Sequence, residues 1–361
     1  LLFLVGCSPK ENTALEEIIK TPEEQSQENE DKENPVVFDE TRSKVAILAY
    51  FDGLIANEQL IVGQHCGDAP TSTADYYNQY VDMLADETGR HVGMLGADFG
   101  WSSGSYYPVN TLIDHWNEGG LVTVSWHADN PFETGVDVYW NTVENKDKIN
   151  LRSLRKGESQ TVAWTSYRTE LDNIAGALQE LSDAGVTVIW RPFHEMNGDF
   201  FWWGMNAYNN QQTNEEDYNA LWIDMYNTLT YDYGLDNLIW TYSVIPYVGW
   251  NADVTSFYPG SDYVDLVGMD YYGANPDFPN YEALKSLGKT IVMSESGPRD
   301  SGYGNWSMVE WADTLKGKAA YFLQWHSWNG AKVAIKDNKN FIEMMNSSTI
   351  ITRDEILTTS F

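Results

Sequence analysis

The alternation of short apolar segments with longer amphipathic segments constrains the fold more than any other feature of this chain. Apolar runs rich in β-branched and aromatic residues are typical of parallel strands buried on both faces, and segments of helical period connect such strands. Eight repeats of this unit predict an α/β fold, a (β/α)8 TIM barrel. The expected strands are Leu60–Gln64, His91–Phe99, Leu121–His127, Val186–Glu195, Asn237–Ile245, Val264–Tyr272, Lys289–Glu295 and Ala319–His326.

Helices are expected between these strands and before the first of them. The longest irregular segment, Asn130–Trp164, follows the third expected strand, and in that place it would form a wall of a cleft. The expected helices are Arg42–Asn57, Ala74–Glu87, Val109–Asn117, Tyr167–Ala184, Glu215–Tyr231, Tyr281–Ser286 and Trp306–Lys316.

The first residues are expected to be a targeting segment and a tether. Residues 1–7 form an apolar run that ends in Gly6 and Cys7, which is typical of the end of a bacterial lipoprotein signal peptide. Cys7 would then be the lipidated residue of the lipobox. Residues 8–38 are rich in Glu, Lys, Gln and Asn, a composition that predicts a disordered, flexible acidic linker. The barrel domain would occupy residues 39–361.

This layout predicts a location in the cell envelope, with contact to the membrane only through the lipid on Cys7. Ser8 does not indicate retention in the inner membrane, and no dense acidic run follows the cysteine directly. We therefore expect an outer-membrane lipoprotein that faces the periplasm rather than the cell surface.

Composition limits the possible partners. The formal net charge of -31 excludes the basic footprint that nucleic-acid binding requires. The 15 Trp and 22 Tyr exceed what a core needs, so some of them are expected to stack on the C–H faces of sugar rings in a neutral polysaccharide. Cys66 is the only other cysteine, so no disulfide is expected and its thiol should be packed. We expect a monomer.

Two expected strands end on glutamates. Glu195 follows His194 at the end of the fourth strand, and Glu295 ends the seventh. Active sites of such barrels lie at the carboxyl ends of the strands, and a pair of carboxylates there is the minimum requirement for glycoside hydrolysis. Arg191 shares parity with Glu195 and should point the same way. The sequence leaves open whether the carboxyl groups lie about 5–5.5 Å apart, as in retaining enzymes, or about 6.5–9.5 Å apart, as in inverting ones.

Polar and aromatic side chains occur at every expected strand end, which packing alone does not explain. Histidine is frequent among them, but the chain has neither a His-x-His pair nor a His-Glu-x-x-His motif, so no metal and no cofactor are expected. A Gly-x-Ser-x-Gly elbow and a phosphate-binding glycine loop are also absent from the sequence. The strand-end candidates are Gln64, His65, Asp98, Trp101, Trp126, His127, His194, Glu195, Tyr242, Asp270, Tyr271, Glu295, Trp325 and His326.

Several of these motifs together resemble glycoside hydrolase family 26, whose best-known members are β-mannanases. The resemblance covers nearly all of the chain after the linker and implies that Glu195 is the acid/base and Glu295 the nucleophile of a retaining enzyme. It also implies that His194 is the partner that precedes the acid/base. The motifs are Arg191-Pro192-Phe193-His194-Glu195, Trp202-Trp203-Gly204, Gly63-Gln64-His65, Ser125-Trp126-His127 and Ser294-Glu295.

The resemblance extends to substrate-binding residues. His127, Tyr271 and Trp325 would line the subsite of the reacting sugar, and Phe200 stands where family members often carry a tryptophan that stacks on the leaving-group side. A smaller apolar face is therefore expected there. Further candidates for contact with the sugar are Asp98, Trp126, Trp202 and Trp203.

The resemblance implies a single catalytic domain that acts as an endo-type β-1,4-mannanase on β-mannan, galactomannan or glucomannan, or on manno-oligosaccharides, by double displacement. Several alternatives stay open at this point. They are an exo-acting enzyme that releases mannobiose, a β-1,3-xylanase, a mixed-linkage β-glucanase, a transglycosylase and a glycan-binding lipoprotein without activity. The presence of both glutamates weighs against the last of these.

Overall fold

The computed structural model describes residues 42–101, 106–133, 138–139, 149–205 and 215–358. The predicted signal segment with Cys7 and the predicted linker lie outside the described residues. In the part that is described, no helix has the length and apolar character needed to cross a membrane.

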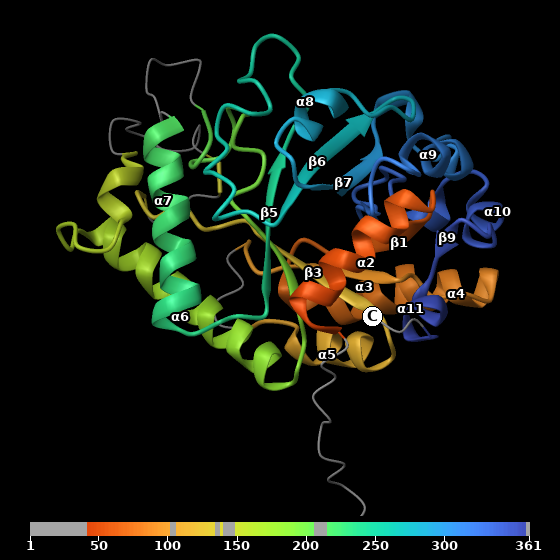
Figure 1. The fold of residues 1–361 in the computed structure, drawn as a ribbon, viewed down its shortest axis with the longest axis horizontal. Helices are drawn as coiled ribbons and strands as arrows, with labels where there is room; N and C mark the ends of the chain where they lie inside the picture. Colours follow the sequence, from red (N-terminus) through yellow and green to blue (C-terminus); the bar gives the residue numbers. More distant parts are fainter. Residues whose placement is uncertain (1–41, 102–105, 134–137, 140–148, 206–214, 359–361) are drawn as a thin grey trace, which may run out of the picture. The chain divides into compact units, whose positions relative to one another are not determined.

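Eight parallel strands close into a barrel, so the predicted TIM fold is confirmed (Figure 1). Neighbouring strands pair in chain order, and β1 closes the sheet by pairing with both β8 and β2. A short ninth strand, β9, adds to the amino-terminal end of β1. The strands are β1 Leu60–His65, β2 Met94–Asp98, β3 Leu121–Trp126, β4 Val188–Pro192, β5 Leu238–Val244, β6 Leu266–Gly273, β7 Thr290–Pro298, β8 Tyr321–Gln324 and β9 Ile350–Ile351.

All the predicted helices are present, with some changes at their ends. α6 begins at Val162, five residues before the predicted start, because the Thr161 hydroxyl accepts a hydrogen bond from the Trp164 amide at 3.1 Å and caps it. The α-helices are α2 Lys44–Ala56, α3 Thr73–Tyr77, α4 Met83–Thr88, α5 Val109–Asn117, α6 Val162–Asp183, α7 Glu215–Asn227, α8 Tyr281–Lys285, α9 Met308–Leu315, α10 Phe341–Met345 and α11 Arg353–Thr358.

Short helical turns of other types extend these helices or stand in loops. The π-helical turn η3 joins α3 to α4, and η8 extends α7, so each predicted single helix has an irregular part. α6 and α7 lie side by side and are joined by an ion pair between Arg168 and Asp224 (Figure 1). The π turns are η3 Asn78–Asp82 and η8 Thr228–Asp232, and the 3₁₀ turns are η2 Pro70–Ser72, η6 Leu151–Leu154, η9 Asp300–Gly302 and η10 Ile335–Asp337.

β4 is shorter than predicted. It ends at Pro192, and the predicted end at Glu195 is wrong because Phe193 and Glu195 have φ angles of 45° and 58°. A strand cannot continue through left-handed residues, so His194 and Glu195 belong to a turn that follows the strand.

Many of the tryptophan side chains pack in the hydrophobic core. Among the described residues, eight tryptophans are fully buried: Trp126, Trp190, Trp202, Trp203, Trp222, Trp240, Trp306 and Trp311. Cys66 is a buried free thiol, as predicted. The expectation that surplus aromatic side chains face a ligand therefore applies to a smaller group, which includes Trp101, Trp325 and Trp328.

Candidate active site

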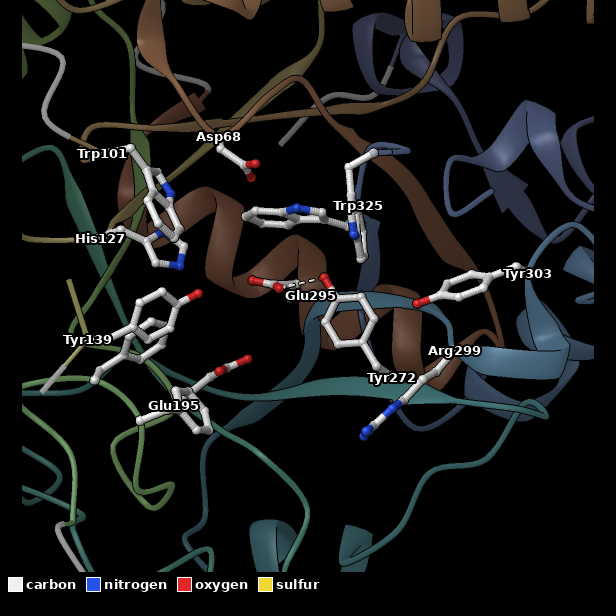
Figure 2. A pocket seen from close by; sticks show the side chains of 13 residues that line it. Asp68, Trp101, His127, Tyr139, Glu195, Tyr272, Glu295, Arg299, Tyr303 and Trp325 are labelled. Carbon is white, nitrogen blue, oxygen red and sulfur yellow. Dashed lines mark hydrogen bonds between the residues drawn. The ribbon is translucent and has the colours of Figure 1, made fainter. Parts of the chain in front are cut away.

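A cavity of about 530 Å³ opens at the carboxyl ends of the barrel strands (Figure 2). Its walls come from β6 and β7 and from the loops after β1, β2, β3, β4, β7 and β8. Most of the lining side chains are aromatic, and Asp68, Glu195 and Glu295 add carboxylates, as in sites that stack sugar rings and bind their hydroxyls. The lining residues are Asp68, Trp101, His127, Tyr139, Glu195, Phe200, Phe201, Tyr272, Glu295, Arg299, Tyr303, Trp325 and Trp328.

Glu195 reaches the cavity from the turn after β4. Its amide donates to the Ser243 carbonyl of β5 at 2.9 Å, and its own carbonyl accepts from Gly198 at 2.9 Å. Its left-handed φ of 58° is a sparsely populated conformation for a non-glycine residue, held here by bonds on both sides. The turn therefore fixes the direction of the carboxylate with local strain.

Glu295 lies within β7 and is held by two hydrogen bonds. Tyr272 of β6 donates its hydroxyl to Oε1 at 2.6 Å, and Arg191 of β4 donates from Nη2 to Oε2 at 2.8 Å. Nη1 of the same guanidinium donates to Asp270 at 3.0 Å. Arg191 and Asp270 are each 1% exposed, so these charges interact with little solvent screening. The parity argument had placed Arg191 beside Glu195, but its hydrogen bonds go to Glu295 and Asp270.

Glu195, Asp270 and Glu295 form a carboxylate cluster. One oxygen from each lies within 4.8 Å of the oxygens of the other two. Three carboxylates at this separation repel one another, and the buried guanidinium of Arg191 offsets part of that repulsion.

The two glutamates differ in their protonation. Burial raises the pKa of Glu195 well above its usual range, and the charges of Glu295 and Asp270 raise it further. Burial also raises the pKa of Glu295, to about 7, while Arg191 and the hydrogen bond from Tyr272 act to lower it. Because Arg191 and Tyr272 both bond directly to Glu295, the surroundings favour the proton on Glu195 and the negative charge on Glu295.

His127 and His194 form a hydrogen-bonded chain with Asp98. Nδ1 of His127 donates to Asp98 Oδ2 at 2.6 Å, and its Nε2 shares a hydrogen bond with His194 Nε2 at 3.0 Å. Burial alone would raise the pKa of Asp98, but the charge of His127 and the hydrogen bonds from His127, Ser125 and Gly100 lower it overall. Burial lowers the pKa of His194, in agreement with a neutral ring.

Asp98 and His194 therefore lie behind the cavity surface rather than on it. Asp98 has no exposed surface and His194 is 1% exposed, whereas His127 reaches the cavity. The prediction that Asp98 and His194 bind substrate directly is not supported, because both side chains are buried and hydrogen-bond to His127 instead.

Trp126, Trp202 and Trp203 also lie outside the cavity, and the prediction that they contact sugar is wrong. All three are fully buried. Trp126 Nε1 donates to Glu170 at 2.8 Å, Trp202 Nε1 to the Ala128 carbonyl at 2.8 Å and Trp203 Nε1 to the His194 carbonyl at 2.8 Å. They support the loops after β3 and β4 from beneath.

Tyr272 takes the place that was predicted for Tyr271. The Tyr271 hydroxyl donates to the Asn275 carbonyl at 3.0 Å, and its ring stacks against Trp311, away from the cavity. Side chains alternate along a strand, so Tyr272 shares the inward face with Asp270. The same period of two in the sequence would have identified Tyr272.

His127, Phe200 and Trp325, three of the predicted substrate-binding residues, line the cavity. Apart from the two glutamates, the other lining residues were not predicted to bind substrate. Tyr139 belongs to the irregular segment after β3, and its ring stacks on Phe201 with the centroids 5.7 Å apart, so the described part of that segment does contribute a wall. Asp68, Arg299, Tyr303 and Trp328 lie in loops that carry no recognisable motif.

A TIM barrel with two glutamates of unequal protonation facing one aromatic cavity defines a glycoside hydrolase of the two-carboxylate type. The chain belongs to glycosyl hydrolase family 26, whose family model matches residues 35–355.

Similar proteins include several mannanases. The mannan endo-1,4-beta-mannosidase A and B of Caldalkalibacillus mannanilyticus is 35% identical over 83% of this chain, which spans 58% of that relative's length. The mannan endo-1,4-beta-mannosidase of Bacillus subtilis is 33% identical over 76% of each chain. Among solved structures, the Bacillus subtilis mannanase BCman matches with a TM-score of 0.73 and 28% identity, covering 85% of this chain and 91% of that one.

Proposed function

We propose that this protein is a retaining, endo-acting β-1,4-mannanase that hydrolyses β-mannan, galactomannan or glucomannan. The observation that carries the proposal is the pair Glu195 and Glu295, whose closest oxygens lie within 4.8 Å and whose surroundings favour opposite protonation states. A separation of this size fits the roughly 5–5.5 Å of retaining enzymes better than the wider gap of inverting ones. The relatives named mannan endo-1,4-beta-mannosidase support mannan as the substrate.

The reaction follows from the geometry. Glu295 attacks the anomeric carbon and forms a glycosyl ester, while Glu195 gives its proton to the departing glycosidic oxygen. Arg191 and Tyr272 fix the carboxylate of Glu295 in place for the attack. Glu195, now ionised, then takes a proton from a water molecule that attacks the same carbon and releases Glu295.

The cavity walls bind the reacting sugar. Trp325 offers its ring face to a pyranose, and the ring of His127, held by Asp98 and His194, forms the neighbouring wall. Tyr139 lies on the side of Glu195 (Figure 2), and Phe200 lines the cavity five residues after Glu195 in the chain. Both therefore belong to the side of the leaving group. Phe200 provides an apolar face of limited area there.

Two other substrates of the same chemistry compete with mannan, namely mixed-linkage β-glucan and β-1,3-xylan. A relative named endoglucanase H, from Acetivibrio thermocellus, is 23% identical over 68% of this chain, which gives the glucan alternative some weight. Linear mannan, galactomannan, glucomannan, mixed-linkage β-glucan and β-1,3-xylan are therefore incubated separately with the protein, and reducing ends are measured. Release from the mannans supports the proposal. Release from glucan or xylan alone would replace the substrate while leaving the mechanism in place.

The pattern of early products distinguishes endo from exo action. An endo-acting enzyme releases a ladder of manno-oligosaccharides from linear mannan, whereas an exo-acting one releases mannobiose from the start. Chromatography of the first minutes of digestion therefore tests this part of the proposal.

We also propose that Cys7 is lipidated and anchors the protein in the outer membrane on its periplasmic side. The support is the apolar run before Cys7 and the polar composition of residues 8–38. The full gene is expressed in its host beside Cys7→Ala, and both proteins are partitioned between detergent and water. Wild-type protein in the aqueous phase would refute the anchor, and digestion by protease added to intact cells would refute the periplasmic side.

A further inference from the structure

We infer that residues 245–252, the loop after β5, form a second binding platform for the polysaccharide, beyond the cavity on the leaving-group side. The loop would hold mannosyl units of the departing chain through the exposed rings of Tyr247 and Trp250. This inference rests on the proposed function, because it assumes a chain of sugars attached to the glycosidic oxygen that Glu195 protonates.

The loop is fastened to the turn that carries Glu195. The Asn197 side chain, two residues after Glu195, accepts from the Ile245 amide at 2.9 Å and donates to the Ile245 carbonyl at 2.8 Å and the Ala252 carbonyl at 3.2 Å. The Ala252 amide donates to the Asn197 carbonyl at 3.0 Å. Asn197 is fully buried, so both ends of the loop are fixed relative to the acid/base turn.

The part of the loop between these ends is rigid and exposes apolar side chains. Asn251 closes it by accepting from the Val248 amide at 2.8 Å and donating to the Pro246 carbonyl at 2.8 Å, and the Tyr247 amide donates to Asn280 at 2.9 Å. Within this frame Tyr247, Val248 and Trp250 are 46%, 60% and 44% exposed. Single exposed apolar residues are common on protein surfaces. Three of them within four positions of a hydrogen-bonded turn indicate a binding surface.

The loop continues the wall of the cavity. A Cβ atom on Gly198 would meet Phe200 at 2.5 Å and Ile245 at 3.1 Å, so Phe200 of the lining and Ile245 of the loop flank the same glycine. Figure 2 shows Glu195 on the same side of the cavity as Tyr139, with Arg299 and Tyr303 across from them. A chain that leaves the cavity past Glu195 therefore runs over Phe200 toward the 245–252 loop.

The chemistry of the loop fits this occupant. Among the described lining residues, none comes from the loop after β5, so its aromatic side chains are free to bind sugar outside the cavity. A pyranose presents an apolar C–H face to an aromatic ring, and a pre-formed turn binds it without the entropic cost of ordering a loop. Two such contacts beyond the cleavage point compensate for the limited area of Phe200, and they favour polymers over short substrates.

The test compares the double variant Tyr247→Ala/Trp250→Ala with wild type on two substrates. Mannohexaose has sugars on the leaving-group side, whereas nitrophenyl β-mannobioside has only the nitrophenyl group there. We expect kcat/KM on mannohexaose to fall about tenfold, and that on the aryl substrate to stay within about twofold. Tyr231→Ala, which removes a tyrosine that is 71% exposed on η8, is the control and should change neither value.

Three results would overturn the inference. Equal kcat/KM of variant and wild type on mannohexaose would show that the loop does not bind the chain. An equal loss on both substrates would show that the loop acts only by supporting the Glu195 turn. Self-association of the wild type in sedimentation that the double variant abolishes would assign the surface to a second copy of the chain. A wild type inactive on all mannans would instead refute the proposed function itself.

Discussion

Arg191 and Tyr272 both donate hydrogen bonds to Glu295. This difference in hydrogen bonding gives the two glutamates different catalytic roles. Glu195 relies on burial and on the neighbouring carboxylates, which raise its pKa, whereas Glu295 has a cation and a hydroxyl that stabilise its charge. A proton donor and a nucleophile are thus set apart by their surroundings rather than by residue type.

Replacement of each glutamate should separate their roles. Glu195→Ala should lower activity on mannan by about 10²–10⁴-fold but retain more on an aryl glycoside, because a good leaving group needs little acid assistance. Glu295→Ala should lose both activities, since no nucleophile remains. Steady-state rates on both substrates check this. Equal residual rates of the two variants on the aryl glycoside would contradict the assignment.

Tyr272→Phe should shift the pH profile. The hydroxyl of Tyr272 lowers the pKa of Glu295, which is about 7, so its removal should raise that pKa and move the acidic limb of kcat/KM upward by roughly one pH unit. The control is Tyr303→Phe, at another tyrosine of the lining, which should leave the limb in place. An unmoved limb in Tyr272→Phe would mean that the tyrosine does not stabilise the ionised nucleophile.

At the residue scale, the sequence predicted only part of the candidate active site. Glu195 and Glu295 follow from the polar residues expected where strands end, and the structure brings them together with Arg191, which bonds to Glu295. Tyr272 was missed although alternation along the strand indicates it. Trp126, Trp202 and Trp203 were placed in the cavity by mistake, because a tryptophan near a strand end has the same sequence pattern whether it faces a sugar or the core.

At the level of elements, the loops after β2 and β3 are fitted to each other around His127. The Gly100 amide donates to Asp98 at 2.7 Å, and a Cβ atom at Gly100 would lie 2.0 Å from the His127 carbonyl oxygen. Only glycine permits so close an approach of the two backbones. The position of His127 at the cavity thus depends on a residue of the neighbouring loop.

Gly100→Ala should therefore displace His127 and reduce kcat/KM on mannan by about 10²-fold, since small misplacements of binding groups are costly. Gly176→Ala is the matched control. Gly176 is exposed in α6, and a Cβ atom added there would meet nothing within 4 Å, so alanine should leave activity unchanged and stabilise the helix by about 1 kcal/mol. Kinetics and thermal unfolding of both variants check these expectations, and full activity of Gly100→Ala would contradict them.

Strands and helices were predictable because their apolar periods are strong, and all eight barrel strands are found. The residues at which these elements begin and end were less predictable. The early end of β4 depends on the left-handed Phe193 and Glu195, a conformation that tertiary bonds impose and that composition does not indicate. The π turns η3 and η8 likewise leave no mark in the hydrophobic pattern.

At the scale of the molecule, Glu170, which lies outside the catalytic site, has a raised pKa. Burial raises the pKa of Glu170 to about 8, helped by the charge of Asp129, while hydrogen bonds from Trp126 and the Asp129 amide oppose the rise. Its folded pKa therefore lies above the ordinary value of 4.5. The stability that Glu170 contributes is complete below about pH 4.5 and is lost as the pH rises toward 8.

Glu170→Gln should remove this pH dependence, because the amide keeps an acceptor for Trp126 but does not ionise. Between about pH 4.5 and 8 the free energy of unfolding of the wild type should fall relative to that of the variant. Urea unfolding at several pH values measures the difference, with Glu180→Gln, at an exposed glutamate of the same helix, as control. Parallel curves for wild type and Glu170→Gln would contradict the raised pKa.

The stereochemistry of the first product tests most directly whether Glu195 and Glu295 act as acid/base and nucleophile. Linear mannan is digested in deuterated buffer, and the anomeric proton of the new reducing end is followed by NMR before mutarotation. Two displacements at one carbon restore its configuration, so the account predicts that the β-anomer appears first. If the α-anomer appears first, the reaction inverts, and Glu295 acts as a general base rather than as the nucleophile.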